Sequence, residues 1–201
     1  MAEFKEIADY FDQLHRDIRQ LIVFIEKLMG EDGYISLPSS GNRACWRITS
    51  HMDRPDGWRA PYLSRCYIPD SEADSFTESL LFLIVLDTDT IFDFPPIVCV
   101  RIVHPPLSER EIYNQVFQIN PFKSLATSRP SWQNFRQEDG WIVAEPAFRT
   151  PITMIQAYIL DLFSLSDQQK VMDYIVQPLR EGGDLTGLVT LPPLPYMQVT
   201  E

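Results

Sequence analysis

The stretch LLFLIVLDTDTIFDFPPIVCVRIVHPP, residues 80–106, decides the fold of this chain. It holds two apolar runs on either side of a loop that carries three aspartates. Runs that are apolar at nearly every position are typical of central strands, because alternation is lost when neither face of a strand meets water. We therefore expect strands at about residues 79–86 and 97–103, in the middle of a sheet.

The loop between these strands has two interpretations. Asp87, Asp89 and Asp93 could give oxygen ligands to magnesium or calcium, which bind converging carboxylates. Aspartate is also common in turns, where its side chain accepts hydrogen bonds from nearby backbone N–H groups. Two phenylalanines and two consecutive prolines make this loop apolar and stiff. We therefore favour the turn, and we expect neither a metal site nor a cofactor.

The N-terminal segment has the pattern of a long amphipathic helix. Between Phe4 and Met29 apolar residues recur at intervals of three and four, and Gly30 follows as a natural helix end. The apolar stripe is wider than the narrow seam of a coiled coil. We expect a helix over residues 3–29 that docks on the core of the domain.

A hairpin is expected between residues 44 and 68. Its two segments flank the sequence Arg-Pro-Asp-Gly, which suits a tight turn with a glycine in the left-handed conformation. The register that this turn sets places Trp46 opposite Cys66, and Arg47 opposite Arg65.

The rest of the chain is expected to add short strands, loops and helices. Short strands are predicted at residues 33–37 and 141–144, and a long loop with one short helix at residues 119–139. Ser108 and Glu111 form a capping box that opens a helix.

Two C-terminal helices are expected. Thr150 and Pro151 are a favourable helix start, and that helix should end near Ser164. A second helix should begin at Ser166 and end near Pro178.

The order of these elements predicts an α+β fold: a long N-terminal amphipathic helix, an about five-stranded, mostly antiparallel sheet, and C-terminal helices. Residues 1–181 should form a single α+β domain, and residues 182–201 a Gly/Pro-rich C-terminal tail. The tail sequence LPPLPYM favours polyproline II, which suits either a WW- or SH3-domain ligand or an extended segment laid on the domain. We favour the second interpretation.

The sequence predicts a soluble cytoplasmic protein without a membrane segment. Its first residues lack the positive start and apolar core of a signal peptide, and no apolar run is long enough to span a bilayer. Cys45, Cys66 and Cys99 show no CxxC spacing, and we expect buried thiols in a reducing compartment.

Charge is unevenly distributed along the chain. The net charge of −11 argues against non-specific nucleic acid binding, which requires clustered Lys and Arg. Residues 43–65 nevertheless contain five arginines and two aspartates, whereas residues 70–93 contain seven acids and no base. Two neighbouring segments of opposite sign are thus expected.

The arginine-rich segment is the candidate ligand- or partner-binding site. Strand alternation gathers its cationic side chains on one face of the expected hairpin, with an aromatic side chain nearby. Either the acids of residues 70–78 fold over this face, or it binds an external anion or an acidic partner through bidentate contacts. The candidate site residues are Arg47, His51, Trp58, Arg59 and Arg65.

No catalytic motif stands out in the sequence. GxSxG, HExxH, Walker and GxGxxG patterns are all absent. His51 and His104 could form an acid–base pair for metal-free phosphodiester cleavage, but nothing in the sequence brings them together. We therefore assign no catalytic residue, and an enzyme is the less favoured class.

The sequence is compatible with three functions, each of which can be tested. The first is a non-catalytic cytoplasmic interaction protein that binds a protein partner, as an inhibitor, adaptor or immunity-type protein does; an acidic chain suits capture of a basic partner. The second is a sensor domain that binds a small anionic ligand through the arginine-rich sheet face. The third is an unrecognised hydrolase or nuclease. The partner's identity and the oligomeric state are open.

Overall fold

The two apolar runs of the quoted stretch form neighbouring strands at the centre of one antiparallel sheet. β3 (Phe76–Val85) pairs with β4 (Pro96–Leu107) over most of its length. Residues 80–85 and 96–100 are buried without interruption, as expected for strands covered on both faces. The predicted central strands are confirmed.

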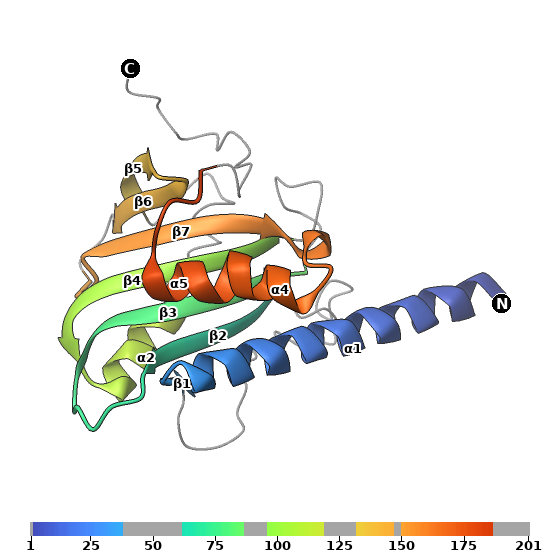
Figure 1. Cartoon of the computed structure of the whole chain (residues 1–201), viewed down its shortest axis with the longest axis horizontal. Coiled ribbons are helices and arrows are strands. Elements are labelled where there is room, and N and C mark those ends of the chain that lie inside the picture. The colour runs from blue at the N-terminus through green and yellow to red at the C-terminus, as the bar shows by residue number, and fades with distance from the viewer. Residues whose placement is uncertain (1, 38–61, 87–95, 119–131, 147–149, 187–201) are drawn as a thin grey trace, which may run out of the picture.

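The structure is a computed structural model, and it describes residues 2–37, 62–86, 96–118, 132–146 and 150–186. Within these residues the sheet has seven antiparallel strands in the order β1-β2-β3-β4-β7-β6-β5 (Figure 1). The α+β class is confirmed, and the sheet has more strands than the five or so expected. The remaining strands are β1 (Tyr34–Leu37), β2 (Tyr62–Pro69), β5 (Trp132–Glu138), β6 (Trp141–Pro146) and β7 (Met154–Asp161).

β7 occupies the segment for which the sequence predicted a helix from Thr150 to Ser164, and that prediction is wrong. β7 pairs with β4 along eight residue pairs and with β6 at three more. A short apolar run does not distinguish a buried strand from a buried helix by its period alone. The unfilled edge of β4 decides between them, because strand pairing satisfies the backbone groups of both segments.

α1 (Ala2–Glu31) is the predicted N-terminal helix, but Gly30 does not end it. The helix runs one residue further, and Gly33 adopts the left-handed conformation with φ +79°. The N–H of Gly33 donates to the carbonyl oxygen of Gly30 at 3.2 Å, which closes the turn into β1.

α2 (Glu109–Gln118) begins at the predicted capping box. The Ser108 hydroxyl donates to Glu111 Oε2 at 2.6 Å, and the Ser108 N–H donates to the same oxygen at 2.9 Å. Leu107 and Ile112 are buried on either side of this start, as expected for a hydrophobic staple. This prediction is confirmed.

The C-terminal helix consists of three consecutive segments: α4 (Gln168–Val171), η3 (Met172–Val176, a π-helix) and α5 (Gln177–Glu181). A separate 3-10 turn, η2 (Leu162–Ser164), precedes it. The helix continues through Pro178, where the sequence predicted its end, and stops at Gly182 with φ +71°. Helices therefore cover both faces of the sheet: α1 and η3–α5 pack on one face, and α2 packs on the other (Figure 1).

The β5–β6 hairpin was not predicted from the sequence. Residues 119–131 of the expected loop lie outside the described residues, but residues 132–138 form β5. Asp139 and Gly140 have φ of 49° and 82°, which is typical of the type I′ turn favoured by Asp-Gly. Leu185, from the segment expected to form a tail, is buried on this turn and donates its N–H to the Asp139 carbonyl oxygen at 2.7 Å.

No helix among the described residues is long and apolar enough to cross a membrane.

Gly140→Ala should lower the free energy of unfolding by about 3 kcal/mol, since a left-handed alanine costs about 1–2 kcal/mol and its Cβ must also displace Leu185. A Cβ at this position would lie 2.6 Å from the Leu185 carbonyl carbon. Gly33→Ala is the matched control, because Gly33 also has a positive φ but meets nothing within 4 Å. Urea denaturation of both variants should show the larger loss for Gly140→Ala, and equal losses would contradict this packing.

Candidate functional site

A groove of about 470 Å³ opens between α1 and the η2–α4 segment. α1 forms one wall with side chains at helical intervals, and its N-terminal half extends beyond the sheet (Figure 1). Ile18 is buried, whereas the apolar neighbours along the same stripe are half-buried and face the groove. The α1 wall consists of Leu14, Asp17, Ile18, Gln20, Leu21 and Phe24.

The opposite wall begins where β7 ends. The Asp161 carboxylate accepts a hydrogen bond from the Phe163 N–H at 2.9 Å, and this cap turns the chain out of the sheet. The turn leaves the Phe163 side chain 59% exposed beside the groove. The lining residues on this wall are Leu162, Phe163, Leu165, Ser166, Asp167, Gln168 and Val171.

Both charged residues of the lining are acidic. Asp17 lies on α1, and Asp167 caps α4 by accepting the Lys170 N–H at 2.9 Å. This backbone hydrogen bond lowers the pKa of Asp167, so its carboxylate stays ionised at neutral pH. The lining combines an apolar surface with negative charge on both walls, and its described residues include no Lys, Arg or His.

Of the five residues in the arginine-rich candidate site, the structure describes Arg65 alone. Its Nε donates to Glu26 Oε1 of α1 at 2.6 Å, and its side chain is 15% exposed. One interpretation of the sequence expected the acids of residues 70–78 to cover the arginines. For Arg65, the carboxylate partner comes from α1 instead. The other four, Arg47, His51, Trp58 and Arg59, lie outside the described residues, and a binding role for the set stays a prediction.

The register predicted for the hairpin is wrong at Cys66. This residue pairs with Leu37 of β1 on one side and with Leu81 of β3 on the other. A strand residue has only two lateral neighbours, so no place opposite Cys66 remains for Trp46. β2 is also covered on both faces, since Cys66 belongs to the core cluster beneath α2 and Tyr67 to the cluster beneath α1.

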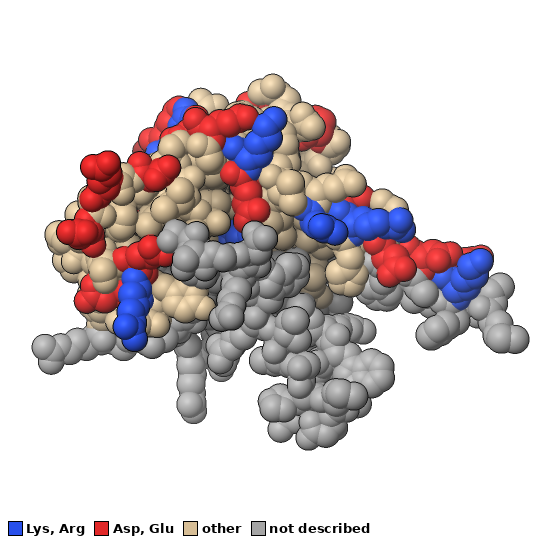
Figure 2. Space-filling view, turned by 90° about the horizontal axis from the view of Figure 1, so that it is seen from below, with Lys and Arg blue, Asp and Glu red and all other residues tan. Residues whose placement is uncertain are grey.

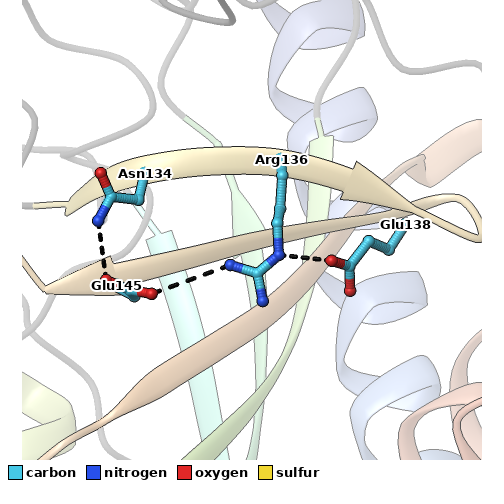
Figure 3. Close-up of polar contacts among 4 residues, drawn as sticks. All are labelled: Asn134, Arg136, Glu138 and Glu145. Atoms are coloured by element: carbon cyan, nitrogen blue, oxygen red, sulfur yellow. Dashed lines mark hydrogen bonds and ion pairs between the residues drawn. The ribbon is translucent and has the colours of Figure 1, made fainter. Parts of the chain in front are cut away.

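Each arginine of the described strands contacts a carboxylate of the chain. Besides Arg65, Arg101 of β4 donates to Glu78 Oε2 at 3.1 Å. On β5, Arg136 contacts Glu138 and lies 3.9 Å from Glu145 of β6 (Figure 3). These guanidinium groups are engaged within the protein.

Asn134 joins the polar contacts of Arg136, Glu138 and Glu145 on the β5–β6 hairpin. Asn134 adopts a φ of 54° at a break in the strand register and donates to Glu145 Oε2 at 2.8 Å (Figure 3). Irregular, charged edge strands resist pairing with other chains. β5 is therefore a poor place for a partner strand to add.

The structure does not test the pair of histidines considered for catalysis. His104 is buried, with Nδ1 2.9 Å from the Pro105 carbonyl oxygen, while His51 lies outside the described residues. Burial raises the pKa of the Cys99 thiol to about 12, so it is not a ready nucleophile. Cys66 is also buried, and Cys45 lies outside the described residues.

The metal interpretation of the aspartate loop is not tested. Asp87, Asp89 and Asp93 lie outside the described residues. Elsewhere, within the residues that the structure does describe, no group of three or more His, Cys, Asp or Glu side chains could hold a metal ion.

Comparisons with protein-family models, with curated proteins and with solved structures found no match for this chain.

The groove was missed because its second wall was predicted incorrectly. The α1 stripe was visible in the sequence, and so was a capping signal, Ser166 with Gln169, although the structure places the cap one residue later, at Asp167. The sequence predicted a helix over residues 150–164, so it did not predict that a strand ends at Asp161 or that η2 turns outward there. Without that turn, the η2–α4 wall could not be placed opposite α1.

Removing the carboxylate partner of Arg65 should destabilise the docking of α1. Glu26→Gln should lower the free energy of unfolding by about 1–2 kcal/mol, because a half-buried guanidinium loses its charged acceptor. Glu31→Gln is the control, since it removes an exposed ion pair with Lys27 at 3.6 Å and should cost less than about 0.5 kcal/mol. Chemical denaturation measures both, and equally small losses would contradict a structural role for the Arg65–Glu26 contact.

Burial also lowers the pKa of His104 below its ordinary value. The unfolded chain then binds a proton more readily than the folded one, so stability is complete above about pH 6.5 and falls as the pH drops below it.

The free energy of unfolding of the wild type should therefore decrease between about pH 7.5 and pH 5.5, whereas that of His104→Gln should change less. The hydrogen-bonded carboxylates of Glu111 and Asp167 have lowered pKa values and titrate below this window. Parallel pH profiles for the two proteins would exclude His104 as the source of the pH dependence.

Proposed function

We propose that this chain is a non-catalytic interaction protein whose groove between α1 and η2–α4 binds a segment of a basic protein partner. The observation that carries the proposal is the open apolar groove, in which the charged residues among those that the structure describes are all acidic. When a partner binds to such a surface, apolar area is buried away from water, which favours binding. The charges of the surface determine which partners bind.

Phe163 is the side chain best placed to anchor a partner. It is 59% exposed, although the residue before it, Leu162, is only 8% exposed in the core. Large aromatic side chains at the centre of an interface contribute much of its binding energy. The Asp161 cap fixes the backbone N–H of Phe163, so the anchor is held in place before binding.

Charge supports a basic partner. The chain has a net charge of −11, and Asp17 and Asp167 bring negative charge to the groove itself. Acidic and basic side chains both lie along the projecting part of α1 (Figure 2). An acidic surface accelerates encounter with a basic protein and disfavours a second copy of the same acidic chain.

The chemistry of the lining supports binding without catalysis. The polar side chains of the described lining are carboxylates, amides and a hydroxyl, and none of them is a histidine or cysteine that would titrate near neutral pH. His104 and Cys99 are buried and do not line the groove.

Replacing the exposed anchor should abolish partner binding without unfolding the protein. Immobilised wild type, Phe163→Glu and Val23→Glu are each exposed to an extract of the source cells. Val23 is the matched control, because it is 57% exposed on α1 and does not line the groove. We expect a protein retained by wild type and by Val23→Glu, and at least about tenfold less of it on Phe163→Glu.

A photo-crosslinker locates the contact. Benzoylphenylalanine in place of Gln168, an exposed lining residue, should crosslink the retained protein, whereas the same group in place of Gln137, exposed on β5, should not. Equal retention on all three columns, absence of any retained protein, or crosslinking at both positions would contradict the proposal.

A further inference from the structure

We infer that the groove takes an amphipathic helix of the partner, inserted beside α1 with Lys or Arg on both sides of its apolar face. This inference rests on the proposed function, because it specifies which kind of partner segment the groove accepts.

The walls of the groove favour a helix over an extended segment. Every described lining residue belongs to α1, to η2, to α4 or to the link between η2 and α4, and none belongs to a described strand. A segment that binds as a β-strand needs a strand edge for its backbone N–H and C=O groups, whereas a helix satisfies these groups internally. A groove lined by side chains of helices therefore suits a helical occupant.

The size of the groove fits the side chains of such a helix. The α1 wall runs from Leu14 to Phe24, which is about 15 Å or three turns at 1.5 Å per residue. A volume of about 470 Å³ holds a few anchoring side chains and leaves the helix backbone outside. Anchors spaced three and four residues apart on one helix face match this arrangement, with Phe163 packing at their side.

The two acidic walls define the charge of the incoming helix. Asp17 accepts a hydrogen bond from Gln13 Nε2 at 2.7 Å, a neutral donor that leaves its charge uncompensated. Asp167 faces the nearby Lys170, whose Nζ contacts the Ser166 hydroxyl at 3.0 Å and the Ser164 carbonyl oxygen. Asp17 is thus the stronger attractor, and basic residues flanking the apolar face of the partner helix reach one acid on each wall.

Two designed peptides test this inference on the intact protein. Both are four-turn amphipathic helices with the same leucine face, and their polar faces carry only Lys or only Glu. Fluorescence anisotropy at low salt should show at least about tenfold tighter binding of the Lys peptide, with a difference that shrinks in 0.5 M salt. Circular dichroism should show that this peptide gains helix on binding.

Matched variants locate the peptide. Phe163→Glu should weaken binding of the Lys peptide at least about tenfold, and Asp17→Lys at least about threefold. Val23→Glu and Asp74→Lys should leave it unchanged, since both positions are exposed and lie outside the lining. Equal binding of the two peptides, no helix gain, or insensitivity to Phe163→Glu would overturn the inference.

The two proposals fail in different ways. A retained protein that crosslinks at Gln168, together with no preference for the Lys peptide, would leave the interaction function in place and overturn the basic helix. Sedimentation provides a further check on the occupant. Self-association of the wild type that Phe163→Glu abolishes would show that a second copy of the chain fills the groove, and would overturn the inference.

Discussion

Burial of both faces of the β3–β4 pair is the constraint on which the rest of the structure depends. These strands have no polar face, and each fully buried apolar side chain contributes about 1.5–3 kcal/mol only if it is covered. Two core clusters result, one closed by α2 and the other by α1 with the C-terminal helices. The neighbouring strands β2 and β7 extend the same two-sided sheet.

The groove lies where α1 and the η2–α4 segment meet at the end of the covered sheet. α1 is longer than the sheet beneath it, and Ile18 is the first of its described side chains to be buried. The Arg65–Glu26 contact holds its C-terminal half against β2. Across from it, the Asp161 cap turns the chain away from β7. Apolar side chains of these two anchored elements face the space between them and form the lining of the groove.

The charged side chains of the sheet and those of the groove differ in how they are paired. Two arginines of the central strands are matched by carboxylates from other elements, Arg65 by α1 and Arg101 by β3. Such pairs join elements and leave little positive charge for a ligand. Asp17 is instead held by the neutral amide of Gln13, and Asp167 by the backbone N–H of Lys170 with the Lys170 ammonium group nearby. Asp17 therefore keeps its negative charge at the groove, and the binding proposal shifts from the arginine-rich segment to this acidic surface.

The sequence by itself determined the α+β class, the two central strands, α1 and the capped start of α2, because continuous burial, helical periodicity and capping are local patterns. It did not determine β7, the partner of Cys66 or the partner of Arg65. Segment 154–161 is a strand because β4 offers it an edge, and Arg65 binds Glu26 because α1 crosses β2. The groove belongs to the same class, since it exists only where two segments distant in sequence diverge, and such long-range neighbours leave no local pattern.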